Sequence, residues 1–342
     1  TKRLWFLVAV AAAIAFIANG ARLSFGVYVV PLSDDFDVGR SQVMLPFVLS
    51  MAMWGLAQPI AGMLLDSRGP RLVILGALVL LVLGFVVSAS ARNLWQLTLG
   101  YGLLVGIADS GLAVAAFSIL ISRWFEKERR GRALGLVLGA IPAGGVVFAP
   151  LASALAYGVS WRFSFLALAG IVALVAFPLA WFFLKGQAAS TANVPRTSAG
   201  GLFSRDVMRA VKTRPYWVLL LAYFGCGSAG FFLQGHLAAL ALRHGFSPGV
   251  GALGLSLIGL GGALGAIVGG WAADRYGRFK VLAIGYFVRG VGFILLTFFV
   301  SNKATFFLAT LVAAAPIYVT ITATQALIYE IFGAGIAGRM LG

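Results

Sequence analysis

Two ionisable residues, Arg22 and Asp109, lie inside long apolar stretches of the sequence. A charged side chain in membrane hydrocarbon is costly, so each residue is a functional candidate. The Arg22 guanidinium can bind a carboxylate in a bidentate manner, which a lysine cannot do. Its alternative role is to extend to the outer lipid headgroups. A buried Asp109 carboxyl group could carry a proton, or it could pair permanently with Arg22 as a structural contact.

Three polar residues could support these two charges. Asn19 precedes Arg22 by about one helical turn and shares its face. Gln234 and His236 lie two residues apart in a later apolar run. Either could bind a substrate, and the imidazole could also shuttle a proton because histidine titrates near neutral pH. The alternative for His236 is an ordinary hydrogen-bonding role between helices.

A further polar set recurs at helical spacing near the end of the chain and consists of Tyr318, Thr322 and Gln325. Their hydroxyl and amide groups could line a cavity. Such groups also hold neighbouring membrane helices together by hydrogen bonds, and the spacing does not distinguish the two roles.

A charged phrase occurs twice, as GMLLDSRGPR at 62–71 and as GWAADRYGRFK at 270–280. The glycines and the aspartate of each copy match with one offset, 208 residues (274 minus 66). Duplicated membrane units joined by charged loops are typical of solute carriers, so transport is the leading hypothesis. An aspartate at a helix end can pair with loop arginines in one conformation and release them in another. The predicted conformational latch comprises Asp66, Arg68, Arg71, Asp274, Arg275 and Arg278. Plain topological anchoring is the alternative for the arginines.

Composition places the chain in a membrane. It is 61% hydrophobic and 11% charged, and its mean hydropathy is +0.98. A soluble fold could not cover so much apolar surface. The net charge of +16 does not indicate a nucleic-acid partner, because 19 of the 26 lysines and arginines fall in the N-terminus and alternate loops. This bias predicts that the N-terminus and those loops face the cytoplasm.

The apolar runs predict an all-α polytopic membrane protein. Ten stretches are long enough to cross a bilayer, at 4–30, 41–63, 71–90, 93–121, 133–157, 161–184, 216–241, 249–273, 280–300 and 304–329. We expect an N-terminal six-helix half at 1–184, a cytoplasmic linker at 185–215 and a C-terminal half at 216–342. We also expect a surface helix near 205–212 within the linker.

A second internal match tests this organisation. The pattern Gly-Arg-x-Leu-Gly occurs at 131–135 and again at 338–342, an offset of 207 residues (338 minus 131). In the first half two more helices follow the pattern, so by analogy we expect two further helices in the second half, which this sequence does not contain.

The two copies of the charged phrase resemble the signature of the major facilitator superfamily. Within it, RLSFGVYVVPL at 22–32, Gly69-Pro-Arg71 and Ala315-Pro316 resemble the monocarboxylate-transporter-like and oxalate/formate-antiporter-like branch. The resemblance implies a rocker-switch carrier with a central site between its halves. It also implies a small organic anion as substrate, often coupled to protons. In this family the first helix lines the cavity, which favours substrate binding by Arg22.

The ninth span is peripheral in this family, so the resemblance implies an interhelix structural role for Arg289. Glu330 lies close to the cytoplasmic end, where a cap or latch is expected. No cofactor, metal ligand set or catalytic triad is predicted, so the chain is not expected to be an enzyme.

The sequence therefore predicts a secondary transporter of the inner or plasma membrane, and the resemblance to the superfamily implies that it works as a monomer. We expect it to move a small organic anion, most simply a monocarboxylate, by proton symport or anion exchange. Its partners would be the substrate, protons and the lipid bilayer, with no nucleic acid. Two alternatives stay open: an exporter of hydrophobic or cationic compounds, and a membrane sensor that does not transport.

Overall fold

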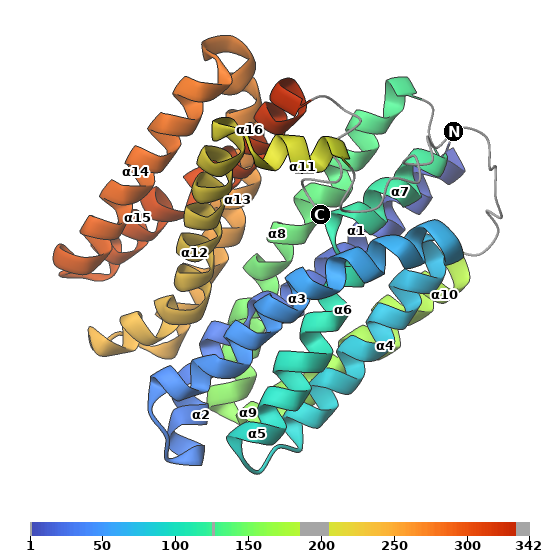
Figure 1. Ribbon diagram of the computed structural model, residues 1–342. Coiled ribbons are helices and arrows are strands. Elements are labelled where there is room, and N and C mark those ends of the chain that lie inside the picture. The colour runs from blue at the N-terminus through green and yellow to red at the C-terminus, as the bar shows by residue number, and fades with distance from the viewer. Residues whose placement is uncertain (1, 125–126, 185–204, 333–342) are drawn as a thin grey trace. The chain divides into compact units, whose positions relative to one another are not determined.

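The computed structural model describes residues 2–124, 127–184 and 205–332, and these residues form helices and short connections without any strand (Figure 1). In this part of the chain, ten helical segments are long and apolar enough to cross a membrane. The ten predicted spans are thus confirmed. The first segment, Arg3–Phe36, extends beyond its predicted end.

The chain divides into two compact units. The first unit contains Thr1–Gln187 and also Gln234–Gly259, and the second contains Ala188–Leu233 and Leu260–Gly342. The first unit is built from α1 (Lys2–Leu23), η1 (Phe25–Tyr28), α2 (Val29–Phe36), α3 (Arg40–Arg68), α4 (Pro70–Ala89), α5 (Leu94–Leu97), η2 (Thr98–Val105), α6 (Gly106–Gly111), α7 (Val114–Trp124), α8 (Lys127–Gly158), α9 (Trp161–Ile171), η3 (Val172–Ala176) and α10 (Phe177–Phe183).

The remaining helices are α11 (Arg205–Val211), α12 (Arg214–Arg243), α13 (Pro248–Tyr276), α14 (Arg278–Phe298), α15 (Lys303–Ala314) and α16 (Pro316–Phe332). The adjoining ends of α12 and α13 belong to the first unit. There the Gln234 backbone oxygen lies against Gly26 of η1, and Gly235 lies against Met44 of α3. The predicted halves are defined by the sequence repeat, whereas these two units are defined by which residues lie close together in space. The two-half organisation stays a prediction.

The repeated charged phrase has one backbone geometry in both copies. Gly69 and Gly277 have φ values of 82° and 88°, in the region that residues with a Cβ rarely adopt. Each glycine stands between two long helices, α3 and α4 in the first copy and α13 and α14 in the second. The glycine therefore reverses the chain within a single residue, and the next helix starts at the following position.

Several membrane segments are interrupted where the sequence predicts one continuous run. The first changes from α-helix to a 3₁₀ turn at η1, which starts three residues after Arg22 (25 minus 22). The fourth contains the π-helical segment η2, and the sixth contains η3. The tenth breaks between α15 and α16 at Pro316, because proline lacks the backbone donor that would continue the helix. Hydropathy detects none of these breaks, since it averages over the whole run.

Close helix packing in the first unit joins α1 to α8. A Cβ built on Gly20 would lie 2.8 Å from the backbone of Gly144, and a Cβ on Gly144 would meet the backbone oxygen of Phe16. Small residues at such a crossing let two backbones approach, which is how membrane helices gain packing energy. This crossing fixes the part of α1 that precedes Arg22.

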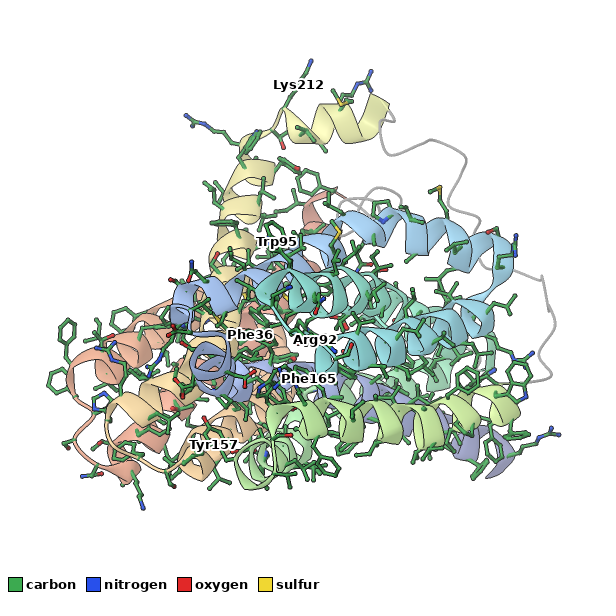
Figure 2. All side chains as sticks on the ribbon, turned by 90° about the horizontal axis from the view of Figure 1, so that it is seen from below. Phe36, Arg92, Trp95, Tyr157, Phe165 and Lys212 are labelled. Atoms are coloured by element: carbon green, nitrogen blue, oxygen red, sulfur yellow. The ribbon has the colours of Figure 1, made fainter. Side chains whose placement is uncertain are left out.

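Large apolar side chains cover much of the outer surface of the helices (Figure 2). Trp95 and Leu174, for example, are each 79% exposed. A soluble monomer rarely exposes large contiguous apolar patches. These surfaces fit a protein whose surroundings are lipid.

Candidate functional site

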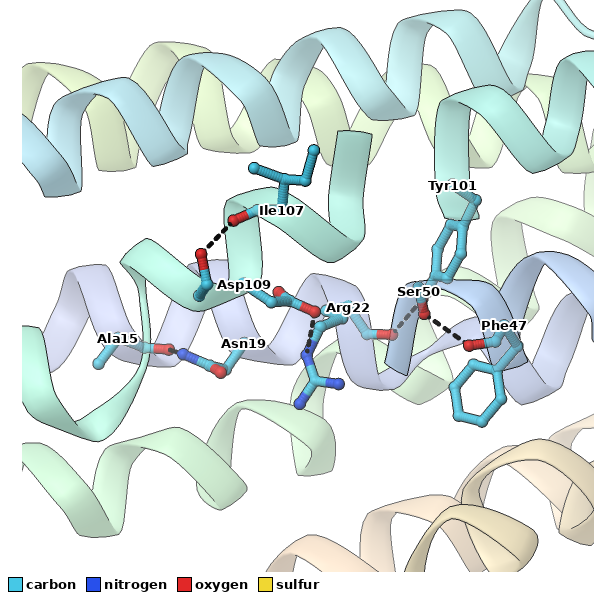
Figure 3. A network of polar contacts seen from close by, with 9 residues as sticks. Ala15, Asn19, Arg22, Phe47, Ser50, Tyr101, Ile107 and Asp109 are labelled. Carbon is cyan, nitrogen blue, oxygen red and sulfur yellow. Dashed lines mark hydrogen bonds and ion pairs between the residues drawn. The ribbon is translucent and has the colours of Figure 1, made fainter. Parts of the chain in front are cut away.

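The candidate site is a buried ion pair in the first unit, formed by Arg22 and Asp109 (Figure 3). Arg22 Nε lies 3.1 Å from Asp109 Oδ2, and the two side chains are 10% and 5% exposed. Arg22 is the penultimate residue of α1, and Asp109 lies in the short helix α6. The two residues are 87 positions apart (109 minus 22), so only folding brings them together.

The Arg22 guanidinium keeps unused donors although it is paired. Its Nη1 is buried and has no hydrogen-bond partner in the structure. The contact between Nε and Asp109 Oδ2 is an ion pair that does not meet hydrogen-bond geometry. The guanidinium carbon lies 5.9 Å from the centre of the Trp54 ring. Arg22 can therefore donate a hydrogen bond to a second anionic oxygen without breaking a well-formed hydrogen bond.

The π-helical segment η2 connects the backbone at Arg22 to the helix that carries Asp109. The Tyr101 hydroxyl donates a hydrogen bond to the Arg22 carbonyl oxygen at 2.9 Å. That carbonyl is free because α1 ends one residue later. Segments of π-helix occur frequently at functional sites, and this one lies directly before α6. Tyr101 thus fixes the end of α1 relative to Asp109.

Sequence reasoning missed Tyr101 and Trp54. Both are aromatic residues with a polar group on an apolar body, inside runs that are otherwise aliphatic or small. That composition was the available signal, because a buried tyrosine hydroxyl or indole N–H needs a partner. The signal does not say which partner, since Tyr101 and Arg22 belong to different helices.

Asn19 is buried one turn before Arg22, but its side chain satisfies its own helix. Its Nδ2 donates to the Ala15 carbonyl oxygen at 3.1 Å (Figure 3). Ser50 of α3, also drawn in Figure 3, donates to the Phe47 carbonyl oxygen in the same way at 2.7 Å. These bonds use one Nδ2 hydrogen of Asn19 and the hydroxyl hydrogen of Ser50. The other Nδ2 hydrogen of Asn19 and the oxygen atoms of both side chains stay available to a ligand.

Gln234 and His236 lie in the part of α12 that belongs to the first unit. The Oε1 atom of Gln234 is buried without a hydrogen-bond partner, so it can accept one from a ligand. His236 is half-buried. Because Gln234 packs against Gly26, this stretch of α12 lies beside the turn that follows Arg22.

The predicted polar set of α16 lies in the second unit. Tyr318 is half-buried, and the side chains of Thr322 and Gln325 lie outside the described part of the structure. The buried face of α16 instead carries Thr320 and Thr324. The cavity role of Tyr318, Thr322 and Gln325 stays a prediction.

The aspartates of the predicted latch, Asp66 and Asp274, also have side chains outside the described part. Three of the arginines make contacts within their own unit. Arg71 donates to the Trp181 carbonyl oxygen at 3.3 Å, and Arg278 pairs with Glu330 at 2.7 Å. Arg275 lies over the Trp271 ring, at 5.6 Å.

Arg68, the fourth arginine of the predicted latch, is exposed. Glu330, expected as a cap or latch, joins the end of α16 to the start of α14 through Arg278. The latch itself stays a prediction. No group of three or more His, Cys, Asp or Glu side chains that could hold a metal occurs among the residues searched, which are those the structure describes.

In the described part of the chain, ten apolar membrane-length segments, together with the buried ion pair of the first unit, are the features of a multi-pass membrane protein. The family model of the Major Facilitator Superfamily matches residues 8–342, and the chain belongs to this family of transporters. The expectation that it is a transporter and not an enzyme is confirmed.

Similar proteins also include members of the narrower predicted branch. The chain is 26% identical to the oxalate:formate antiporter of Oxalobacter formigenes, over 99% of this chain and 80% of that protein. It is 31% identical to monocarboxylate transporter 11 of Mus musculus, over 79% of this chain and 59% of that protein. It is 26% identical to YcxA of Bacillus subtilis, an uncharacterised transporter of the same superfamily, over 83% of this chain and 69% of that protein. The predicted resemblance is thus confirmed.

The fold has close counterparts among solved structures. The crystal structure of a bacterial homologue of the human lysosomal transporter Spinster, inward-facing and occupied, superposes with a TM-score of 0.78 at 20% identity. The match covers 100% of this chain and 78% of that one. At this identity the likeness establishes the fold alone.

Proposed function

We propose that this protein is a secondary active transporter of small organic anions, most simply monocarboxylates, which it moves by alternating access. The observation that carries the proposal is the buried Arg22 guanidinium with a free Nη1 beside Asp109. A guanidinium in this state offers donors and charge to a carboxylate. Relatives named as an oxalate:formate antiporter and as a monocarboxylate transporter support the same substrate class.

Charge balance suggests how substrate and proton are coupled. Without substrate, Arg22 and Asp109 neutralise each other. When a substrate carboxylate binds Arg22, the site holds two negative groups and one positive group, which is costly in a buried place. Protonation of Asp109 restores neutrality, so one substrate anion and one proton cross together. His236 is the second candidate for the proton, because an imidazole can bind one near neutral pH.

Anion exchange needs the same arginine but no proton. In that mode one carboxylate leaves Arg22 on one side of the membrane and another replaces it on the other side. Asn19, Gln234, Tyr318, Thr322 and Gln325 are proposed to complete the substrate site. Asp66 and Asp274, with Arg68, Arg71, Arg275 and Arg278, are proposed as the latch that follows the movement.

The distribution of lysine and arginine supports a topology with the N-terminus and central linker in the cytoplasm. The proposed location is the inner or plasma membrane. We also propose that the protein works as a monomer, as the superfamily resemblance suggests.

Uptake into proteoliposomes tests the proposal. The purified protein is reconstituted, and uptake of a panel of labelled monocarboxylates is measured with and without an inward proton gradient. We expect gradient-stimulated uptake, and we expect Arg22→Ala to reduce it to the level of protein-free vesicles. Arg92→Ala serves as the matched control, because Arg92 is an exposed arginine outside the site.

Two outcomes would contradict the proposal. If no carboxylate enters under either gradient or exchange conditions, while hydrophobic or cationic compounds are exported, the exporter alternative holds. If ligands bind without any flux, the protein is a sensor. Uptake that is equal in Arg22→Ala and Arg92→Ala would keep transport but remove Arg22 from the site.

A further inference from the structure

A second buried arginine, Arg289, lies in the second unit and has no carboxylate partner in the described structure. It is the twelfth residue of α14, within a membrane-length segment, and is 3% exposed. Its Nη2 donates to the Thr320 hydroxyl oxygen at 2.6 Å. Its Nε and Nη1 are buried without any hydrogen-bond partner.

Among the described residues, the groups that contact Arg289 are neutral. The guanidinium lies over the Tyr286 ring, at 5.4 Å, and the Tyr286 hydroxyl donates to the Ala222 carbonyl oxygen. The Thr320 hydroxyl lies 3.2 Å from the sulfur of Cys226 and bonds backbone carbonyl groups of its own helix. None of these contacts offers the arginine a negative charge.

The acidic residues of the second unit lie at other positions along its helices. Glu330 pairs with Arg278 at the start of α14, 11 residues from Arg289 (289 minus 278). At about 1.5 Å per residue this is roughly 16 Å along the helix. Asp274 precedes Arg278 by four residues, at the end of α13, and Asp206 lies in α11, ahead of the membrane segments.

The internal repeat shows that the fold does not need a charge at this position. α4 follows Gly69 as α14 follows Gly277, so the twelfth residue of α4 is the counterpart of Arg289. That residue is Leu81, and it is 0% exposed. An apolar side chain fills the same place in the first unit. Arg289 therefore adds a charge where helix packing alone would favour a leucine.

We propose that Arg289, positioned by its hydrogen bond to Thr320, forms a binding site for a small carboxylate anion inside the second unit, separate from the Arg22 site. A buried guanidinium without a counter-charge is strongly unfavourable. A carboxylate supplies that charge and offers oxygen acceptors to the N–H groups of Nε and Nη1. The geometry of a planar carboxylate matches the guanidinium better than that of a spherical ion. This site is a property of the second unit and does not depend on transport.

Binding of labelled acetate to the purified protein tests the site, with Arg22→Ala as the background that removes the other arginine. We expect Arg22→Ala to bind acetate saturably at one site, and acetate to raise its melting temperature. Adding Arg289→Leu should weaken the binding by about tenfold or more, as the loss of a charge-assisted contact predicts, and should abolish the thermal shift. Leucine is chosen because Leu81 fills the equivalent position, so the variant should pack and fold.

Arg289→Lys is the second variant, since it keeps the charge but loses the planar fork. It should bind acetate more weakly than the parent and more tightly than Arg289→Leu. The proposal is wrong if Arg22→Ala binds no acetate, or if Arg289→Leu leaves its binding unchanged. A melting temperature that does not respond to acetate but rises on Arg289→Leu would also overturn it, because Arg289 would then be a purely destabilising charge. This experiment measures binding and not transport. If it fails, the proposed transport function is not affected and is still tested by the uptake experiment.

Discussion

At the scale of single residues, the chemistry of this protein concerns two arginines in membrane segments that differ in their surroundings. Arg22 lies beside Asp109, whereas Arg289 bonds only a threonine hydroxyl among the described residues. A buried ion pair contributes little net stability, but removal of one partner leaves a costly isolated charge. The Arg22–Asp109 pair can therefore be kept for function while contributing little to folding.

A double-mutant cycle distinguishes these roles. Arg22→Leu and Asp109→Leu should each lower the free energy of unfolding, by about 3–5 kcal/mol, because each strands the other charge. The double variant should recover most of that loss, since an apolar pair fills the same space. Thermal unfolding of the three variants in detergent measures the effect.

Transport should not recover together with stability. None of the three variants should show proton-driven uptake of carboxylate, because each lacks the anion-binding group, the proton-binding group or both. A double variant that is fully active would mean that the pair is structural only. A double variant that is as unstable as the sum of the singles would mean that the two residues do not interact.

At the scale of helices, the site depends on how firmly α1 is fixed against its neighbours. The crossing of α1 with α8 at Gly20 and Gly144 leaves no space for a side chain. The hydrogen bond from Tyr101 then holds the carbonyl end of α1. Two contacts, one before Arg22 and one at Arg22 itself, therefore set the position of the guanidinium.

Substitution of Gly144 by alanine should destabilise the protein, because its Cβ would collide with the Phe16 backbone oxygen. A clash between backbones cannot be relieved by a rotamer change, so we expect a loss of about 1–3 kcal/mol or more. Gly139→Ala in the same helix is the matched control, since a Cβ there meets nothing within 4 Å. The control should be neutral or slightly stabilising, because alanine favours a helix over glycine.

The comparison of melting temperatures of the two glycine variants checks this prediction. Equal melting temperatures would show that α1 and α8 are further apart than the structure places them. A loss confined to Gly144→Ala would support the crossing as the anchor of α1.

At the scale of the whole molecule, the proposed coupling makes transport electroneutral. One carboxylate and one proton cross together, so no net charge moves. Proton-driven uptake in proteoliposomes should therefore be insensitive to a membrane potential imposed with potassium and valinomycin. Asp109→Asn should lose the stimulation by a proton gradient while it keeps carboxylate exchange.

The same vesicles can also contradict electroneutral coupling of one proton to each carboxylate. Uptake that accelerates when the interior is made positive would mean that net negative charge crosses and that no proton accompanies each substrate. Unchanged proton stimulation in Asp109→Asn would move the proton to another group, with His236 as the next candidate.

The sequence alone determined the membrane class, the ten spans, the repeat and the family. It could do so because these properties depend on local runs of apolar residues and on short phrases such as the one around Asp66. It also selected Arg22 and Asp109, since a charge in an apolar run is conspicuous wherever it lies. The charged phrase also aligned Gly69 with Gly277, and the structure shows that both stand between two long helices with a positive φ.

Only the tertiary structure decided which of these residues meet. Arg22 pairs with Asp109, and Tyr101 bonds the end of α1, in each case across two helices. Whether Nε and Nη1 of Arg289 find a partner likewise depends on the neighbouring helices. The breaks at η1 and η2 also depend on where backbone groups find partners. Hydropathy reports how a residue prefers lipid over water, but it carries no information about which helix lies opposite, and that choice determines the chemistry of the site.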